Sequence, residues 1–455
     1  MKRIIMFLLI LSIIISLSSA LLANSLKLNG LGSKSLSMGG AFVGLADDYS
    51  AIFWNPAGLV NLKNKYIGLS VIDASSFGSY KLDVYFPGRG NINLIDAETQ
   101  KHHYISGLVA YCSPISENCV AGFGAYSLSN FGITWDGADF AVISPHATAL
   151  IDWMSKIEAI TLAPTIALKI NNQFSIGASI NINYGLFDIA LHSGRWLLPL
   201  PDPPYFKDID LGQYDLSTTG WGYGATVGVY FKSSNIFSFG ATLRTASTIK
   251  FSGEAGVSGM PELGFSAGKD LNQTSDVETK ITWPMWIAAG VAIKPTQNFT
   301  LTADIQWTQW SKIDVIKIDY KDKSWQQIMT KKYKDKMLMD WDNTIQIRIG
   351  TEYRFDRFAF RGGFYIDPSP APDITVDVFF PTYDYNVITF GLGYKLEKFQ
   401  IDLGFEYYIK KERVIAPQGI IVWPPDEFEP GWQFPMPGTY DMRIIAPSLS
   451  ISYKF

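Results

Sequence analysis

Large apolar residues alternate with small or polar residues along most of the chain from residue 65 onward. In residues 174–186, the even positions read Phe, Ile, Ala, Ile, Ile, Tyr and Leu, and the odd positions read Ser, Gly, Ser, Asn, Asn and Gly. The same period of two recurs in residues 221–231, 345–355 and 399–409. Successive side chains of a strand point to opposite faces, so the pattern predicts strands with one apolar and one polar face.

Fourteen segments fit this pattern, and the connections between them alternate between short turns and long loops. A soluble sandwich of this length would form several domains joined by linkers, and no linker is evident. An even strand number with short turns at one end and long loops at the other is typical of outer-membrane barrels. We therefore predict an all-β fold, a 14-stranded antiparallel transmembrane β-barrel over residues 65–455. The strands are expected near 65–86, 101–115, 119–134, 155–169, 173–191, 217–233, 236–252, 277–294, 298–318, 341–355, 358–367, 384–396, 398–411 and 440–455.

Composition agrees with a barrel in a membrane. Of the 455 residues, 18% are charged, which is below the roughly 25% of soluble domains. The 13 Trp, 23 Tyr and 29 Phe fit aromatic girdles at the two membrane interfaces. A net charge of −4 gives no electrostatic footprint for nucleic acid.

The first 23 residues have the features of a secretory signal peptide. Lys2 and Arg3 precede an apolar run from Ile4 to Leu17, and small residues follow, with cleavage expected after residue 20 or 23. The alternative is an N-terminal membrane anchor, if the apolar run extends through Leu22.

Residues 24–64 do not alternate and are rich in small residues. A barrel of fourteen strands is too wide for wall side chains to fill, so we expect this segment to form a partly helical hatch inside the lumen. A tail outside the lumen is the alternative. Asp47 is a candidate cap for a short helix that ends at Asn55, because the residue before Pro56 disfavours helical geometry. Polar wall residues expected to hold the hatch are Asp304, Arg348, Glu352, Arg354, Arg361, Asp402 and Glu406. The alternative is that one of the arginines binds the head group of a ligand.

Residues 39–59, with Asp47-Asp48 followed by Asn55-Pro56-Ala57, resemble the hatch signature of the FadL/TodX family of outer-membrane transporters for hydrophobic compounds. The segments 281–286, 307–311, 348–353, 361–370 and 391–394 resemble the family's later strands, in the same order. The resemblance implies a 14-stranded barrel with an N-terminal hatch. It also implies passive uptake of long-chain fatty acids or other hydrophobic small molecules. Scaffold or shuttle barrels for protein secretion share a similar hatch signature and remain the alternative.

The resemblance also assigns roles to particular residues. Ligand would be captured by an apolar outer loop, pass to a pocket at the hatch, and leave sideways where the third strand is kinked. The alternatives are a loop that only packs as a lid, hatch residues that only pack against the wall, and glycines common to barrel strands. The capture residues are Arg195, Trp196, Leu197, Leu198, Leu200, Tyr205 and Phe206; the hatch-pocket residues are Phe42, Phe53, Trp54, Asn55, Pro56 and Ala57; the lateral opening is Asn130, Phe131 and Gly132.

Other candidate chemistry is limited. Cys112 and Cys119 flank a short turn and are a possible disulfide of an exported protein. The four histidines lie in no metal-ligand or nucleophile motif, so we expect no enzyme activity, metal or cofactor. Tyr453 and the terminal Phe455 resemble the signal read by barrel-assembly machinery. We expect a monomer in the bacterial outer membrane whose partners are its lipid, that machinery and a hydrophobic ligand.

Overall fold

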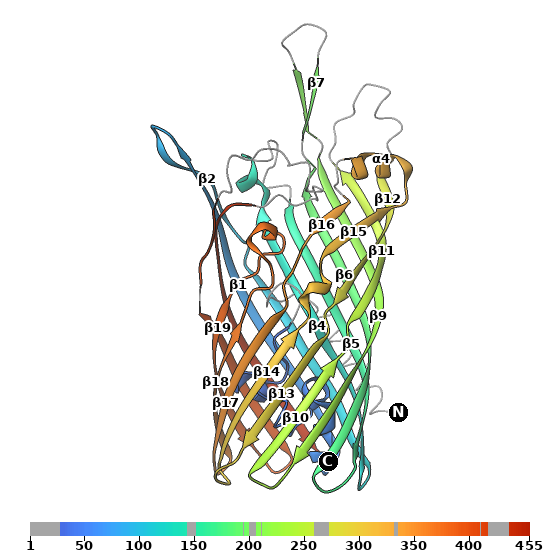
Figure 1. Cartoon of the computed structure of the whole chain (residues 1–455), viewed down its shortest axis with the longest axis vertical. Helices are drawn as coiled ribbons and strands as arrows, with labels where there is room; N and C mark the ends of the chain where they lie inside the picture. Colours follow the sequence, from blue (N-terminus) through green and yellow to red (C-terminus); the bar gives the residue numbers. More distant parts are fainter. Residues whose placement is uncertain are drawn as a thin grey trace.

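The computed structural model describes residues 28–142, 152–193, 195–199, 206–210, 212–258, 273–331, 335–409, 411–416 and 436–455. A single large antiparallel sheet closes on itself, because β1 (Tyr66–Phe86) pairs with both β3 (His102–Ser116) and β22 (Gly438–Lys454) (Figure 1). The predicted signal peptide lies outside the described residues. Among these residues, no helix is long and apolar enough to cross a membrane.

Fourteen antiparallel strands surround the lumen when each interrupted strand is counted once, which confirms the predicted fold class. The uninterrupted strands are β1, β3, β4 (Cys119–Asp136), β5 (Asp152–Lys169), β6 (Phe174–His192), β9 (Gln213–Lys232), β18 (Phe358–Asp367), β19 (Tyr385–Lys395) and β22. The interrupted ones are β10 (Phe237–Arg244) with β11 (Ser247–Ser258), β12 (Thr274–Trp283) with β13 (Trp286–Ile293), β14 (Phe299–Thr308) with β15 (Val315–Tyr320), β16 (Lys336–Leu338) with β17 (Thr344–Phe355), and β20 (Phe399–Ile409) with β21 (Arg413–Ile415).

Short turns gather at one end of the barrel and long connections at the other (Figure 1). At the long-loop end, β2 (Gly90–Glu98) extends β1 as a hairpin, β7 (Arg195–Pro199) and β8 (Phe206–Asp210) form a separate hairpin, and α4 (Lys323–Lys331) packs on β15. The outward faces are apolar, as Ile345, Ile347 and Ile349 show by being about half exposed. In an outer-membrane barrel, such a belt faces lipid.

Residues 28–62 lie inside the barrel toward its short-turn end, where Figure 1 draws them in dark blue. They contain α2 (Ser33–Ser37), α3 (Ala51–Trp54) and the 3-10 helix η1 (Pro56–Asn61). Asp304 of the wall accepts a hydrogen bond from the Val43 backbone at 2.7 Å. The Arg348 guanidinium donates to the carbonyls of Asn29 and Gly39 at 3.1 and 3.2 Å. Side chains of the wall thereby satisfy backbone groups of this hatch that would otherwise be buried without partners.

The expected helix cap, Asp47, forms an ion pair instead, and its neighbour Asp48 binds at the start of the helix. α3 ends at Trp54 with an extended Asn55, as predicted, but Asp47 does not cap it. Asp47 pairs instead with Lys34, which holds its pKa below the usual range although burial raises it. Asp48 accepts hydrogen bonds from the Ser50 backbone and hydroxyl before the helix, and burial raises its pKa to about 6.

The hatch is fitted closely to glycines of the wall. A Cβ atom at Gly363 would lie 2.2 Å from the Gly39 nitrogen, and one at Gly240 would lie 2.1 Å from the Val43 carbonyl oxygen. Gly39 itself has a φ of +66°, a conformation that suits glycine. The wall therefore admits the hatch backbone only because these positions lack side chains.

The two cysteines are free thiols in this structure. Cys112 is opposite Gly122 in the β3–β4 ladder, whereas Cys119 is opposite Ser116, three residue steps away along β4. Three steps in a strand span about 10 Å, and a disulfide needs Cα atoms within about 7 Å. The register corrects the disulfide expected from the sequence.

Candidate functional site

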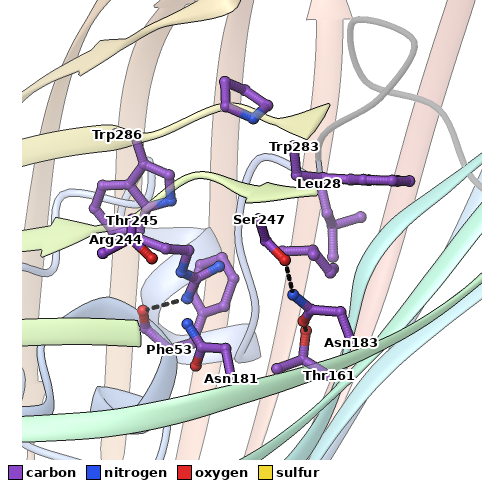
Figure 2. Close-up of a pocket in the computed structure, with 12 residues that line it drawn as sticks. Leu28, Phe53, Thr161, Asn181, Asn183, Arg244, Thr245, Ser247, Trp283 and Trp286 are labelled. Carbon is purple, nitrogen blue, oxygen red and sulfur yellow. Dashed lines mark hydrogen bonds between the residues drawn. The ribbon is translucent and has the colours of Figure 1, made fainter. Parts of the chain in front are cut away.

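A small pocket, with a cavity volume of about 30 Å³, lies between the hatch and the barrel wall (Figure 2). Its apolar surface comes from the hatch, from β4 and from the region where β12 meets β13, and its polar surface comes from β5, β6 and β10. A mostly apolar concavity with a few polar groups is the usual form of a small-molecule site. The lining residues are Leu28, Phe53, Leu128, Thr161, Asn181, Asn183, Arg244, Thr245, Ser247, Trp283, Pro284 and Trp286.

The pocket forms where two neighbouring strands are interrupted. Pro284 has no backbone N–H to donate to a ladder, and it separates β12 from β13. The adjacent strand breaks after Arg244, where the Thr245 side chain accepts from the Ala225 backbone at 2.9 Å. Trp283 and Trp286 flank Pro284 and both line the pocket. The interruptions create room in the wall that regular strands would fill.

Arg244 is the charged group of this pocket, and its side chain is almost completely buried. Nη2 donates to the Phe53 carbonyl at 3.1 Å, as Figure 2 shows, and Nε donates to the Thr226 hydroxyl at 3.3 Å. The guanidinium also lies 4.6 Å from the ring centre of Phe53 and 5.2 Å from that of Trp286.

Arg244 forms no ion pair with any residue that the structure describes. Burial of a charge is costly unless a counter-charge or hydrogen bonds compensate it. Aromatic faces and neutral acceptors, Tyr126 among them, compensate this cation only in part. The pocket therefore offers positive charge to an anionic group of a ligand.

A row of polar side chains forms the opposite side of the pocket. The Thr161 hydroxyl donates to Asn183 at 2.7 Å, and Asn183 donates to the Ser247 hydroxyl at 2.7 Å (Figure 2). Asn181 donates to the Thr226 hydroxyl at 2.9 Å, and the same hydroxyl accepts from Arg244. These bonds hold the polar side chains away from the apolar part formed by Leu28, Leu128 and the two tryptophans.

The wall beside the pocket has an incomplete ladder between β3 and β4. The two strands pair only from Leu108 opposite Tyr126 down to the short turn. Beyond that point β3 pairs with β1 and β4 pairs with β5, and a β-bulge separates Ser127 from Ser129. Leu128, the extra residue of the bulge, also lines the pocket. A weakness in the wall thus lies directly beside the pocket.

Side chains take the place of the missing ladder bonds. Asn130 Nδ2 donates to the Ile105 carbonyl at 3.1 Å and contacts the Ser106 hydroxyl at 3.2 Å. The Gly107 backbone donates to the Ser127 hydroxyl at 3.3 Å. Such bonds break by rotation of a side chain, without separation of a continuous backbone ladder.

On the long-loop side, the connection 368–383 folds into the lumen. Val376, Val378 and Phe380 are almost completely buried, and Trp135 donates to the Val378 carbonyl at 2.9 Å. Arg413 holds both ends of the connection through the carbonyls of Ala371 and Thr382. Burial raises the pKa of the Asp377 carboxyl within it to about 7, although it accepts from the Phe379 and Phe380 backbones.

Aromatic rings lead from this inward connection to the pocket. Phe380 lies 6.5 Å from Phe187, Phe187 lies 6.2 Å from Phe251, and Phe251 lies 6.3 Å from Trp283, measured between ring centres. Trp283 itself lines the pocket. The interior surface between the long-loop end and the pocket is therefore apolar along this line of rings.

The structure brings together only part of the predicted hatch pocket. Phe53 lines the pocket, whereas Phe42 and Trp54 do not. Trp54 donates to the Leu31 carbonyl at 2.9 Å and packs beside Arg348. Asn55 donates to the carbonyls of Val43 and Val229, and its side chain accepts from the Ala57 backbone, so the Asn55-Pro56-Ala57 element fixes the hatch to the wall.

The other predicted sites have different outcomes. Asn130 lies in the gap between β3 and β4, but the bulge is at Leu128, two residues before the predicted opening. The backbones of Phe131 and Gly132 pair with Ile157 and Lys156 of β5. Of the capture residues, 195–198 lie in β7 and Phe206 lies in β8, while Leu200 and Tyr205 fall outside the described residues. The ring of Tyr453 packs against Phe455 and Phe399.

Comparison with known proteins identifies the family. The family model described as outer membrane protein transport protein (OMPP1/FadL/TodX) matches residues 13–455. The chain belongs to the FadL/TodX family. This is a family of outer-membrane channels for hydrophobic compounds and fatty acids, and its members are transporters rather than enzymes. The predicted bacterial outer-membrane location is thereby confirmed.

Several relatives of this FadL/TodX protein have known names or structures. A long-chain fatty acid transport protein of Escherichia coli O6:H1 is 24% identical over 317 residues, which are 65% of this chain and 68% of the relative. A Pseudomonas aeruginosa FadL homologue superposes with a TM-score of 0.73 at 17% identity, over 95% of this chain and all of the other. The Ralstonia pickettii toluene transporter TbuX superposes with a TM-score of 0.66 at 16% identity, over 94% of this chain and 99% of the other.

Sequence reasoning missed Arg244, Trp283 and Trp286 as pocket residues. The segment 281–286 resembles the family's later strands, and Pro284 within a strand is a signal that the ladder breaks there. Nothing local marks Arg244, because its role depends on Phe53 and Trp286, which are distant in sequence.

Proposed function

We propose that this protein is a passive outer-membrane channel for amphiphilic carboxylates with long apolar chains, such as long-chain fatty acids. The observation that carries the proposal is Arg244, a buried cation without an acidic partner among the described residues, in a pocket whose other walls are largely apolar. A carboxylate would pair with the guanidinium, and the apolar chain would contact Leu28, Leu128 and Trp283.

Entry from the long-loop end fits the arrangement of apolar surface. The β7–β8 hairpin projects beyond the barrel rim (Figure 1), and its apolar sequence Trp196-Leu197-Leu198 would serve as a capture site for apolar chains. The line of rings from Phe380 to Trp283 then provides apolar contacts inside the lumen. Passage requires the inward connection 368–383 to move, because it fills the lumen above the pocket.

Exit through the wall fits the gap between β3 and β4. Leu128 belongs both to the bulge of that gap and to the lining of the pocket. A ligand that leaves there enters the membrane without crossing the hatch, which is anchored to the wall by several polar contacts. Widening the gap would require breaking the bonds of Asn130 and Ser127.

The test is uptake by an outer-membrane host that lacks its own channel, with labelled oleate and labelled toluene supplied separately. Wild-type protein should raise oleate uptake above the empty vector. Arg244→Gln should reduce oleate uptake by about tenfold or more, since a hydrogen bond to a charged group contributes about 1.5–3 kcal/mol. Arg244→Lys should retain part of it, and toluene uptake should change by less than about twofold in either variant.

The amount of each variant at the cell surface, and the change of its gel migration on heating, show whether the barrel is folded. Equal oleate uptake by wild type and folded Arg244→Gln would contradict the carboxylate assignment. Toluene uptake without any oleate uptake would make neutral hydrocarbons the substrate. A folded barrel that transports neither would contradict the channel itself.

A further inference from the structure

The outward face of the barrel carries two lysines that face each other directly. Lys250 of β11 and Lys280 of β12 are register partners, and both side chains are exposed. Partners opposite each other in a sheet have Cβ atoms about 4.5–5.5 Å apart, and like charges in such positions are destabilising. Neither lysine forms an ion pair with a described residue, whereas nearby Lys321 pairs with Glu278 at 2.8 Å and Lys317 with Asp319 at 2.8 Å.

The register places this pair in a row with two exposed aromatic residues. Lys250 is opposite Trp221 of β9, and Trp221 is opposite Tyr184 of β6, whose ring lies 4.8 Å from that of Trp221. The row Tyr184, Trp221, Lys250 and Lys280 therefore crosses four neighbouring strands on the outside of the barrel. Aromatic residues at such positions form the girdle at the membrane interface.

The outward-facing apolar side chains of β9 show where this row lies relative to the membrane. On the outward face, apolar side chains run from Phe231 at the short-turn end to Trp221, and the exposed positions beyond Trp221 are Thr219, Ser217 and Asp215. The ten residue steps from Phe231 to Trp221 rise about 25 Å in a strand tilted by about 40°, the height of an outer-membrane belt. The lysine pair thus lies at the boundary nearest the long loops, which face outside in such barrels.

The neighbours of the pair favour a compact anion at this boundary. One step toward the membrane centre, the hydroxyls of Thr248 and Thr282 share a hydrogen bond of 2.9 Å. In the next outward-facing row toward the outside, Ser252 is opposite Glu278, whose carboxylate pairs with Lys321, and in the row beyond that Glu254 is opposite Asp276, so the positive surface is confined to one row. An extended acidic polymer would meet these carboxylates, whereas a single phosphate at the lipid boundary would not.

We propose that Lys250 and Lys280 bind a phosphate of a phosphorylated, acylated glycolipid in the outer leaflet. The two ammonium groups would contact one phosphate, and the acyl chains would lie along the exposed side chains of Tyr223, Val227 and Ile287. The lipid anion would remove the repulsion between the lysines. The site is on the outside of the barrel and does not depend on the proposed transport activity.

The experiment measures glycolipid binding by the purified full-length barrel in a neutral detergent. The probes are a bis-phosphorylated, acylated glucosamine disaccharide, the same glycolipid without its phosphates, and inorganic phosphate. Wild type should bind the phosphorylated glycolipid most tightly. Lys250→Gln/Lys280→Gln should bind it about 30-fold more weakly, since each lysine near an anionic lipid surface strengthens binding about fivefold.

The matched control is Lys81→Gln/Lys156→Gln, which removes two charges from lysines that lie away from the site and are already paired, with Asp96 and Glu158. It should weaken binding by less than about threefold. Unchanged binding by folded Lys250→Gln/Lys280→Gln would overturn the proposal, and so would equal binding of the dephosphorylated glycolipid. Inorganic phosphate binding as tightly as the glycolipid would show a small-anion site instead of a lipid site.

Discussion

The side chain of Asn130 donates a hydrogen bond of 3.1 Å to the backbone carbonyl of Ile105, across the stretch where β3 and β4 have no continuous ladder. The bond joins two strands that each pair regularly with their other neighbour, β1 and β5. A barrel wall in lipid must satisfy its backbone groups internally. Asn130 therefore closes the wall by a side chain that can rotate away.

The first prediction concerns this bond. Asn130→Ala should leave the barrel folded and lower its free energy of unfolding by about 2 kcal/mol, because the side-chain hydrogen bonds to Ile105 and Ser106 are lost. Oleate uptake should stay at or above the wild-type rate, since the gap then opens more easily. The temperature at which the gel migration of the barrel changes measures the stability, and uptake of labelled oleate measures the transport rate. A folded variant with uptake reduced severalfold would contradict a gating role for Asn130.

The second prediction concerns the fit of the hatch against the wall. A methyl group at Gly363 would lie 2.2 Å from the Gly39 nitrogen, whereas one at Gly362 would meet nothing closer than 3.8 Å. Gly363→Ala should displace the hatch and raise the leak of a bulky hydrophilic antibiotic severalfold. Gly362→Ala is the adjacent control and should not raise it. Equal leak in the two variants would show that this contact does not seat the hatch.

The third prediction concerns the inward connection 368–383. Asp377 has a pKa of about 7 in the folded protein against an ordinary value of 3.8, because burial disfavours its charged form. A raised carboxyl pKa stabilises the packed connection fully below pH 3.8, and this stabilisation is lost as the pH rises to about 7. Asp377→Asn stays neutral and keeps an oxygen that accepts from the backbones of Phe379 and Phe380.

Limited proteolysis of intact cells checks this pH dependence. Wild-type protein should be cut within 368–383 faster at pH 8 than at pH 5, after correction for the protease's own pH profile. The Asp377→Asn protein should be cut at the same low rate at both values. A pH-independent wild type would show that the charge of Asp377 does not control the packing.

The strands were predictable because their physics is local. Alternation along residues 174–186 requires only that one face meets lipid and the other the lumen, and β6 occupies Phe174–His192 as expected. The end of α3 was predictable from Pro56 alone. The role of Asp47 could not be predicted, because its partner Lys34 is brought near only by the folded hatch.

The pocket was only partly predictable for the same reason. Phe53 was expected from its place in the hatch signature, but Arg244 becomes a pocket residue through contacts with Phe53 and Trp286 across the lumen. The bulge at Leu128 was misplaced by two residues, because Ser127-Leu128-Ser129 continues the alternation and only the register with β5 shows the extra residue.

The most direct test of the account locks the wall gap. Ser106→Cys/Asn130→Cys, in a background with Cys112 and Cys119 replaced by Ala, joins positions whose side chains lie 3.2 Å apart. Ala303→Cys/Ile349→Cys joins register partners of the intact β14–β17 ladder and serves as the control. The measurement is oleate uptake by both oxidised proteins before and after a reductant. We expect the gap lock to stop uptake, the reductant to restore it, and the control bridge to leave it unchanged. Full uptake through a barrel whose gap bridge is shown to be closed would contradict lateral exit between β3 and β4.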